Sequence, residues 1–463
     1  MDDLPAVPAD RIAALAAELR ELLGEAAVLD TDSALARATR DGSYLSPVIK
    51  ELLPLGRAQL VAFPASAEQI AETVAAAVRH DVPVTPRGKG TSNYGQAIPM
   101  GGGLVLDTSK ARAIHEVGEG YLVADPGVTM MALENAANEA GQQLPMYPST
   151  ANSSLGGFVS GGSGGTGSIK NGMLHTGFVR AMDVVLAEPE PRLVHLEGPA
   201  TEPYIHKYGV VAVIAKLWIE LEPLQDWRAF YASFDDFHDA FALIRPFSAL
   251  EPTPRLVSGD LPTLADALPD DPALPKGRAS LRAILDVASL EEATRLVEAH
   301  GGTVEDVREG AQATVRLSMQ SYNHPIQYLQ VAYPDTYFHV EVSGDAIIDR
   351  VDELHAVYED GMLHVEGQRG RPIGMLAGRY RGAEEVYSGF AKLAELGVGF
   401  HNPHQWYVDY EPEATAALAA ETDPRGLLNP GKLVSPEEVA AAASGSQVAD
   451  LPGGAPARAG GAG

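Results

Sequence analysis

Two glycine-rich stretches next to strand-like segments constrain what this chain can fold into more than any other feature. The first is PRGKGTSNYGQ at residues 86–96, directly after an apolar stretch. Gly88, Gly90 and Gly95 allow backbone turns that a side chain would block, so successive N–H groups can converge on one anion. The first stretch therefore predicts a loop that binds phosphate.

The second glycine-rich stretch lies within residues 144–171, which have little periodicity and are bracketed by strand-like segments. A glycine-rich loop held inside a sheet is usually functional. Its GGSGGTG segment contains the G-x-G-x-x-G spacing of a dinucleotide fingerprint, but the following SIKNGMLHTG lacks the helical periodicity that a Rossmann fold requires. We therefore reject the Rossmann interpretation, and the sequence contains no Walker A motif.

Length, charge and cysteine content limit the class of protein. At 463 residues the chain is long enough for two or three domains and a core that encloses a sizeable ligand. Its formal net charge of -28 argues against nucleic acid or an anionic membrane surface as a partner, because both require a basic footprint. The sequence has no cysteine, which excludes disulfides, thiolate metal sites and a cysteinyl bond to a cofactor.

The N-terminus and the apolar segments predict where the protein acts. The first residues are acidic, and Ile12, Leu15, Leu19 and Leu22 follow at helical spacing, unlike a signal peptide. No run in the sequence approaches the ~20 apolar residues of a membrane span. We expect a cytoplasmic protein that binds neither membrane nor nucleic acid and acts on a small molecule. The sequence leaves the oligomeric state open.

The order of predicted helices and strands is that of an α+β protein with two units. Ser66 and Gln69 are expected to form a capping box for a helix, and Ser289 with Glu292 for a second one. Strands are expected in the segments SLRAILDV, TVEDVRE, ATVRLSM and TYFHVEVS. We predict a helical lead-in at 1–53, a ligand-binding domain at 54–224, a second domain at 225–421, a C-terminal return at 422–443 and a disordered tail at 444–463.

Four motifs, in order, give this chain a resemblance to a known family. VPVTPRGKGTSNYGQAIPMGGGLVLD, YPSTANSSLGGFVSGGSGGTGSIKNG, YGVVAVIAKLWIELEP and DPRGLLNPGKL are similar to motifs of the flavin-binding part of the vanillyl-alcohol oxidase (PCMH-type) flavoproteins. The resemblance is greatest to their D-lactate and glycolate dehydrogenase branch. It implies a two-part PCMH-type FAD-binding domain with an inserted α+β cap domain that shapes the substrate site.

The resemblance also implies which residues contact FAD. The first loop holds the pyrophosphate, and the second lines the isoalloxazine. Lys89 is interpreted either as a solvated loop lysine or as a charge on the pyrophosphate. The predicted cofactor-binding residues are Pro86, Arg87, Gly88, Lys89, Gly90, Thr91, Ser92, Asn93, Gly95, Gln96, Pro148, Ser149, Thr150, Ser153, Ser154, Gly156, Gly157, Ser160, Gly161, Gly162, Gly165, Val213, Ile214 and Asn429.

Two features of the family are missing or open. The D-2-hydroxy-acid branch carries a metal-binding H-x-G-D-G-N-x-H segment, and nothing like it occurs here, so we predict no metal. Family members with covalent FAD use His or Cys, and His401 or His404 remain candidate anchors for such a bond. We expect non-covalent FAD, because the first loop has no histidine.

Candidate catalytic residues come from the predicted cap. If the polar faces of its strands cover the flavin, Arg316 can hold an anionic or polar substrate while His339 accepts a proton; alternatively these faces meet only water. Tyr322 and His324 lie in an aromatic segment that either binds a hydroxylated substrate or simply packs. HNPHQW, with His401 and His404, is expected to form a wall of the active site, and Arg379 and Tyr380 are secondary candidates.

These features predict an FAD-dependent oxidoreductase that removes a hydride from a hydroxylated carbon of an alcohol or hydroxy acid. One alternative is a phenol oxidase of the vanillyl-alcohol type, which the tyrosine-rich cap supports. A second alternative is a protein with structural FAD and a non-catalytic cap, which the missing metal segment supports.

Overall fold

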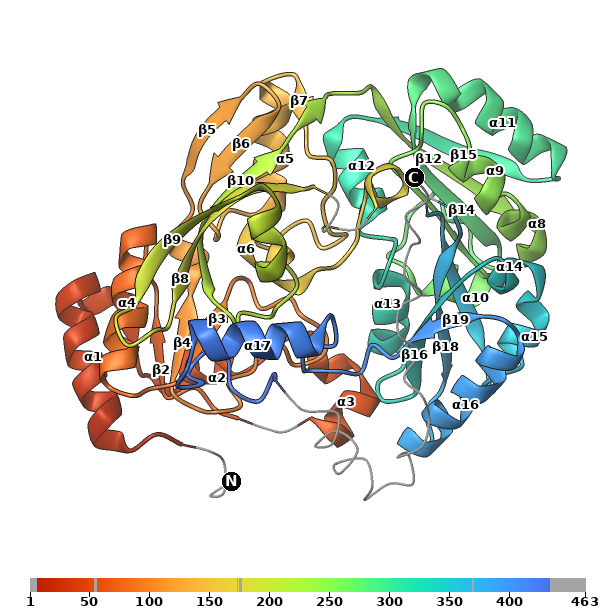
Figure 1. Ribbon diagram of the computed structural model, residues 1–463. Helices are drawn as coiled ribbons and strands as arrows, with labels where there is room; N and C mark the ends of the chain where they lie inside the picture. The colour runs from red at the N-terminus through yellow and green to blue at the C-terminus, as the bar shows by residue number, and fades with distance from the viewer. Residues whose placement is uncertain (1–5, 54–55, 173, 175–176, 369, 434–463) are drawn as a thin grey trace.

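A computed structural model describes residues 6–53, 56–172, 174, 177–368 and 370–433. The predicted tail at 444–463 lies outside the described residues. Figure 1 shows two masses of helix and sheet side by side, joined through strands and loops in the centre of the view. None of the helices in the described ranges combines the length and hydropathy needed to cross a membrane.

The N-terminal part begins with a four-stranded sheet of order β1-β2-β4-β3, in which β2, β4 and β3 run parallel. Helix α4 starts at a capping box, because the Ser66 Oγ accepts from the Gln69 N–H and the Gln69 side chain accepts from the Ala65 N–H. The elements are α1 (Ala9–Leu23), β1 (Val28–Leu29), α2 (Asp32–Ala38), α3 (Pro47–Leu52), β2 (Leu60–Ala62), α4 (Ala67–Arg79), β3 (Val84–Arg87) and β4 (Leu104–Asp107).

A five-stranded antiparallel sheet of order β5-β6-β10-β8-β9 follows, and its apolar face packs on α5 and α6. A two-stranded ribbon, β7 with β11, closes this part. The elements are β5 (Ile114–Gly118), β6 (Tyr121–Ala124), α5 (Met130–Glu139), β7 (Gln142–Gln143), α6 (Leu155–Gly161), α7 (Ser168–Asn171), β8 (Val179–Leu186), β9 (Arg192–Glu197), β10 (Val213–Glu220) and β11 (Glu222–Pro223).

The C-terminal part is built on an eight-stranded antiparallel sheet of order β15-β12-β14-β13-β17-β18-β16-β19. Its elements are β12 (Trp227–Phe234), α8 (Phe237–Ala242), α9 (Ile244–Ser248), β13 (Leu256–Asp260), α10 (Pro262–Ala267), β14 (Ala279–Asp286), α11 (Leu290–Ala299), β15 (Thr303–Glu309), α12 (Ala311–Ser318), α13 (His324–Ala332), β16 (Tyr337–Ser343), α14 (Ala346–Asp349), α15 (Val351–His355), β17 (Met362–Glu366), β18 (Ile373–Arg379), α16 (Ala383–Glu395) and β19 (Gly399–His401).

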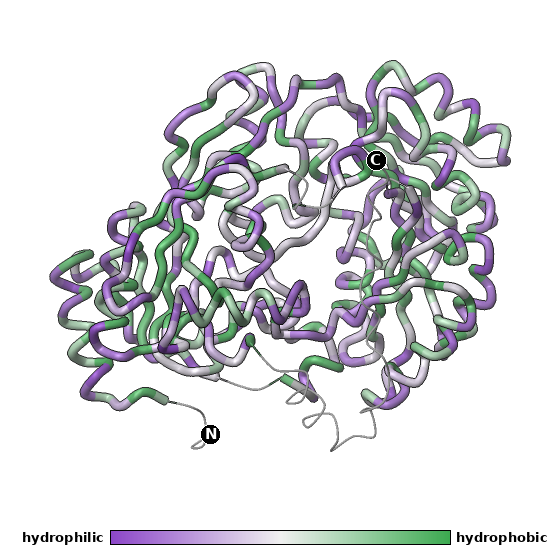
Figure 2. The backbone as a smooth tube through the Cα atoms, in the orientation of Figure 1, coloured by the Kyte–Doolittle hydropathy of each residue, from purple (hydrophilic) through white to green (hydrophobic). Residues whose placement is uncertain are grey.

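The two faces of the eight-stranded sheet differ because side chains alternate along each strand. One face carries Phe338, Val340 and the other apolar residues that pack on the outer helices. The opposite face combines polar residues, His339 and Glu341 among them, with apolar ones that pack on α10, α12 and α13, and it is turned toward the N-terminal part (Figure 1). Figure 2 shows hydrophobic stretches concentrated along the strands of both parts.

Two local predictions were wrong. The segment ATVRLSM is helix α12 rather than a strand, because its buried residues Thr314, Leu317 and Ser318 have the three-and-four spacing of a helix. Ser289 precedes α11 without capping it; its hydroxyl donates to the Glu251 carbonyl instead.

The chain returns to its N-terminal part after β19. Helix α17 (Pro412–Thr422), blue in Figure 1, packs on the segment before β10 through Ala419 and Val211. The following residues lie beside β3, where the Val84 N–H donates to the Leu427 carbonyl and the Asn429 N–H to the Val84 carbonyl. The last described residues therefore reach the loop that follows β3.

Candidate functional site

The two glycine-rich stretches lie against each other. The Thr91 and Ser153 hydroxyl oxygens are 2.9 Å apart, which joins the loop after β3 to the loop before α6. A Cβ placed on Gly88 would lie 1.9 Å from the Ser154 Oγ, so no side chain fits between them. The sequence could not show this contact, because 60 or more residues separate the two stretches.

The first loop presents unused backbone donors. Gly90 and Gly95 have φ angles of 64° and 90°, which glycine adopts without strain. Within the part of the chain that the structure describes, the N–H groups of residues 88–93 donate no hydrogen bond to protein atoms. These donors are available to an anion, as the sequence predicted for this loop.

The N-terminal segment supports the first loop, which the sequence did not reveal. The Arg87 guanidinium donates to the Ala38 and Arg40 carbonyls, and burial lowers its pKa. The Ser92 hydroxyl donates to the buried Asp41 carboxylate at 2.7 Å. Arg87 is thus committed to backbone carbonyls, although the sequence placed it among the cofactor contacts.

The second loop leads into helix α6 instead of a Rossmann crossover. The Ser154 Oγ caps α6 by accepting from the Gly157 N–H at 3.3 Å. A Cβ on Gly161 would meet no atom within 4 Å, so open space borders this end of the helix. Of the other predicted residues, Pro148, Ser149 and Thr150 precede α6, Gly156, Gly157 and Ser160 lie in it, and Gly162 and Gly165 follow it.

The C-terminal return completes the wall below the first loop. The Asn429 side-chain amide donates to the Gln96 and Tyr208 carbonyls. The Lys432 Nζ is fully buried and donates to the Gly95 carbonyl at 2.5 Å, and burial lowers its pKa to about 7. Asn429 was predicted from the sequence and Lys432 was not.

The residues present fit FAD. The free N–H groups of residues 88–93 match a phosphate anion, and charge-assisted hydrogen bonds of this kind contribute roughly 1.5–3 kcal/mol each. Val213 and Ile214, predicted to contact the adenine half, begin strand β10 and are themselves buried in apolar cores. Across the described ranges, no three His, Asp or Glu side chains are grouped so as to hold a metal ion.

A buried histidine pair lies where the first loop meets the eight-stranded sheet. The Tyr94 hydroxyl oxygen and the His339 Nε2 are 2.9 Å apart, and the centroids of the His339 and His404 rings are 5.8 Å apart. Burial lowers the pKa of His339 to about 4 and that of His404 well below its usual value. The structure thus brings together His339 and His404, which the sequence predicted, and Tyr94, which it did not.

Two ring nitrogens of this pair have no hydrogen-bond partner among the described residues: Nδ1 of His339 and Nε2 of His404. Buried polar atoms are normally paired, so each unpaired one requires an explanation. A bound substrate would supply the missing partner. A small cavity of about 10 Å³ borders His339 and Tyr94 and also touches α13 through Gln327.

His401 is held by two carboxylates. Its ring nitrogens lie 3.0 Å from the Glu341 Oε2 and 2.6 Å from the Asp409 Oδ2. Burial alone would lower its pKa, but the hydrogen bonds to Asp409 and Glu341 raise it to about 10. His401 therefore carries a positive charge at neutral pH, and its two hydrogen bonds link Asp409 to Glu341 on strand β16.

The remaining predicted residues have other partners. The Tyr322 hydroxyl donates to the Gly165 carbonyl, and the His324 Nδ1 lies 3.3 Å from the Ser321 carbonyl. Arg316 is half-exposed on α12 and pairs with Asp271 at 3.1 Å. The secondary candidates are also engaged, because Arg379 pairs with Asp360 and the Tyr380 hydroxyl donates to Glu51.

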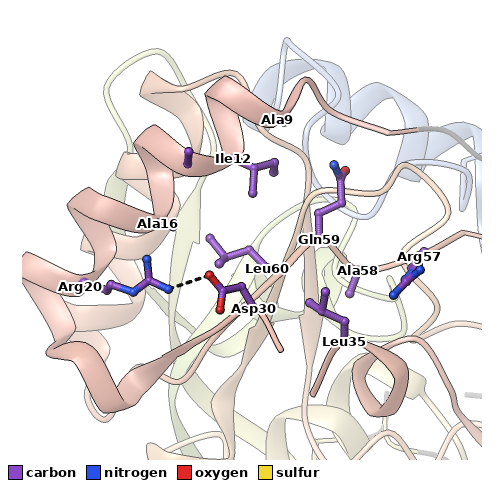
Figure 3. A pocket seen from close by; sticks show the side chains of 11 residues that line it. Ala9, Ile12, Ala16, Arg20, Asp30, Leu35, Arg57, Ala58, Gln59 and Leu60 are labelled. Carbon is purple, nitrogen blue, oxygen red and sulfur yellow. Dashed lines mark hydrogen bonds and ion pairs between the residues drawn. The ribbon is translucent and has the colours of Figure 1, made fainter. Parts of the chain in front are cut away.

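A larger cavity of about 490 Å³ lies elsewhere. Figure 3 shows it between α1 and the β1–β2 edge of the first sheet, with Arg20 paired to Asp30 at its side. In the strand order β1-β2-β4-β3 this edge is opposite the strand that leads into the first glycine loop. This cavity is therefore separate from the site built by the two loops.

Comparisons with known proteins identify relatives of this arrangement. The family described as FAD binding domain matches residues 58–192. An uncharacterized FAD-linked oxidoreductase of Mycobacterium tuberculosis is 28% identical over 242 residues, which cover 50% of this chain and 50% of that protein. The glycolate oxidase subunit GlcD of Bacillus subtilis is 25% identical over 80% of this chain and 87% of its own length.

The fold also matches solved structures. A structure of alkyldihydroxyacetonephosphate synthase aligns with a TM-score of 0.72 at 13% identity, covering 93% of this chain and 86% of that one. This likeness shows the fold alone. The chain spans about half the length of the mycobacterial relative that it matches.

Proposed function

We propose that this chain, which has the fold of the PCMH-type flavoenzymes, is an FAD-dependent oxidoreductase that removes a hydride from a hydroxylated carbon of a small molecule. The observation that carries the proposal is the buried, neutral His404 with an unpartnered ring nitrogen beside His339. FAD, when bound, supplies the acceptor for the hydride. The chain supplies the group that accepts the hydroxyl proton.

The tautomer of His404 makes it the better proton acceptor of the pair. The Asn402 Oδ1 accepts from the His404 backbone N–H at 3.1 Å, which fixes that atom as the amide oxygen. The same oxygen lies 3.0 Å from the His404 Nδ1, which must therefore carry a hydrogen. The Nε2 of His404 keeps its lone pair and can take the proton of a substrate hydroxyl.

His339 has the complementary tautomer. Burial and nearby Glu341 raise the pKa of Tyr94, so its hydroxyl stays protonated. Among the described residues, this hydroxyl has one hydrogen-bond partner, the His339 Nε2. We propose that the Tyr94 hydroxyl donates to Nε2, which places the hydrogen of His339 on Nδ1. We propose His339 as a donor to the substrate oxygen, whereas the sequence proposed it as the base.

The test is the rate of flavin reduction without oxygen, measured with a panel of alcohols and hydroxy acids. We expect His404→Gln to retain FAD and slow reduction by roughly 10²–10⁴-fold, the range for loss of a general base. His339→Gln should slow it by roughly 10²-fold through loss of a donor. His300→Gln, at the end of α11, is the matched control. Full activity of the His404 variant would remove it as the base.

The same panel separates the alternatives. Reduction by 4-alkylphenols but not by alcohols or hydroxy acids would favour a phenol oxidase, and a flavin that no donor reduces would favour structural FAD. The cap tyrosines give the phenol alternative little support, because Tyr322 donates to the Gly165 carbonyl and Tyr333 is half-exposed.

We also propose that FAD is held without a covalent bond. Both ring nitrogens of His401 are taken by Glu341 and Asp409, so this candidate anchor has no free nucleophilic atom. The Nε2 of His404, the other candidate, has no partner among the described residues, and we assign it to proton transfer instead of a bond to the flavin. Acid precipitation of the purified protein should release the flavin into the supernatant. A yellow pellet would overturn this proposal without affecting the proposed reaction.

A further inference from the structure

The charges around the histidine pair bear on the substrate. Resting on the proposed function, we infer that the electron donor is uncharged beside its reacting carbon, as in an alcohol or a hydroxy amide, and that 2-hydroxy acids are disfavoured. The juxtaposition that carries this inference is the pair of carboxylates, Glu341 and Asp409, on either side of the His401 ring, next to His339 and His404.

This group carries one negative charge in excess. Burial raises the pKa values of Glu341 and Asp409, but the hydrogen bonds to His401 and the charge of its ring together lower both. His401 supplies one positive charge against these two negative ones. His339 and His404 contribute no charge at neutral pH, since burial lowers the pKa of each.

The other cations near this site already have partners. The Lys207 Nζ is buried, lies 3.8 Å from the Glu411 carboxylate and donates to the Tyr410 carbonyl. Lys432 donates to the Gly95 carbonyl and is influenced by Asp41. The Lys207 Nζ is thus directed at Tyr410 and Glu411 and the Lys432 Nζ at the Gly95 carbonyl, and neither is recorded in an ion pair with Glu341 or Asp409.

Arg87 and Arg316 do not offset the excess negative charge either. The Arg87 guanidinium donates to the Ala38, Arg40 and Ala97 carbonyls and is influenced by two nearby aspartates. Arg316, which the sequence suggested as the anchor for an anionic substrate, pairs with Asp271. Asp271 also pairs with Arg308 on β15, at the edge of the eight-stranded sheet far from β16.

A carboxylate next to the reacting carbon would bring a second negative charge toward this excess. Like charges several ångströms apart in a partly buried site repel enough to change an equilibrium constant by about tenfold or more. A neutral amide has the same shape and the same reacting C–H and O–H bonds but avoids this repulsion. The charge of the group beside the carbon therefore becomes the property that the site selects.

The experiment compares isosteric pairs: D-lactate with D-lactamide, and glycolate with glycolamide. The holoenzyme is mixed anaerobically with each, and the rate constant of flavin reduction is measured. Calorimetry measures, in parallel, the affinity for propionate and for propionamide, which lack the reacting hydroxyl. We expect the amide of each pair to reduce the flavin and bind at least about tenfold better than the acid.

Two variants identify the charge responsible. Glu341→Gln and Asp409→Asn each remove one negative charge while keeping an oxygen that accepts from His401, and each should reduce the preference for the amide by about tenfold. Glu298→Gln, an exposed residue on α11, removes a charge far from the site and should leave the preference unchanged. If both variants lose FAD, the wild-type protein can be measured at high ionic strength, which should reduce its preference for the amide over the acid. Salt can screen these charges because the side chains of Glu341, His401 and Asp409 are 22–40% exposed.

The outcomes separate this inference from the proposed function. Acids that react and bind as well as amides, with no change in the variants, would overturn the inference and leave hydride removal intact. If no hydroxylated compound reduces the flavin but propionamide still binds better than propionate, the proposed function fails and the charge selection stands. Equal binding of propionate and propionamide together with an inert flavin would overturn both.

Discussion

The contact between Gly88 and Ser154 allows the joining of the two glycine loops to be tested directly. An alanine at position 88 would place its Cβ 1.9 Å from the Ser154 Oγ, so the serine must move. Moving it removes the N-cap of α6, which costs about 1 kcal/mol, and overpacking adds about 1–3 kcal/mol. We expect Gly88→Ala to lower the stability of the FAD-free protein by about 2–4 kcal/mol in total.

The assay is thermal unfolding of the FAD-free protein together with FAD affinity from flavin fluorescence. A loss of this size corresponds to a Tm lower by roughly 5–10 °C for a cooperative unit of this kind. FAD should also bind more weakly, because the N–H groups of residues 88–93 change direction when the loops move apart.

A double-mutant cycle shows whether the contact between residue 88 and the Ser154 Oγ causes the loss of stability. Ser154→Ala removes the Oγ at the cost of the helix cap, about 1 kcal/mol, and the nearest remaining side-chain atom is then the residue 154 Cβ at 3.1 Å. Gly88→Ala should therefore cost much less in the Ser154→Ala background than in the wild type. Equal costs in the two backgrounds would refute the argument, because they would place the strain elsewhere.

Three further predictions concern the cofactor, the base and the buried ion pair. Gly161→Ala should leave the Tm unchanged or higher, since its Cβ meets no protein atom, yet weaken FAD binding in fluorescence titration if the cofactor lies in that space; unchanged affinity would place the cofactor elsewhere. The rate constant of flavin reduction should stay flat from pH 8 to pH 6, because the base must be neutral and the pKa of His404 lies well below 6.5; a fall centred at pH 6.5 would argue against His404. Glu134→Gln should lower stability in urea by about 3–5 kcal/mol, since it leaves the buried Arg255 guanidinium, now 2.6 Å from Glu134, without its carboxylate; a loss below about 1 kcal/mol would contradict this.

The sequence predicted much of the fold because its signals are local. The sequence predicted strands β14, β15 and β16 and helices α4 and α11, and the Ser66 Oγ caps α4 as expected. The segment ATVRLSM was misassigned because seven residues fit both an alternating and a helical pattern, and only packing shows which residues are buried. Arg316 consequently lies on a helix, paired with Asp271.

In the candidate site, too, some features followed from the sequence and others only from the tertiary structure. Glycine spacing predicted a loop that binds phosphate, since the backbone conformations that glycine permits are a property of the residue itself. FAD as the ligand of both loops came from the resemblance of four motifs to a flavoprotein family. The partners of His339 and His404, the two carboxylates on His401 and the roles of Tyr94 and Lys432 depend on segments that are far apart in sequence and meet only in the folded chain. Which ring nitrogen carries a hydrogen, and where charge is left in excess, depend on neighbours within a few ångströms, so the tertiary structure alone determined them.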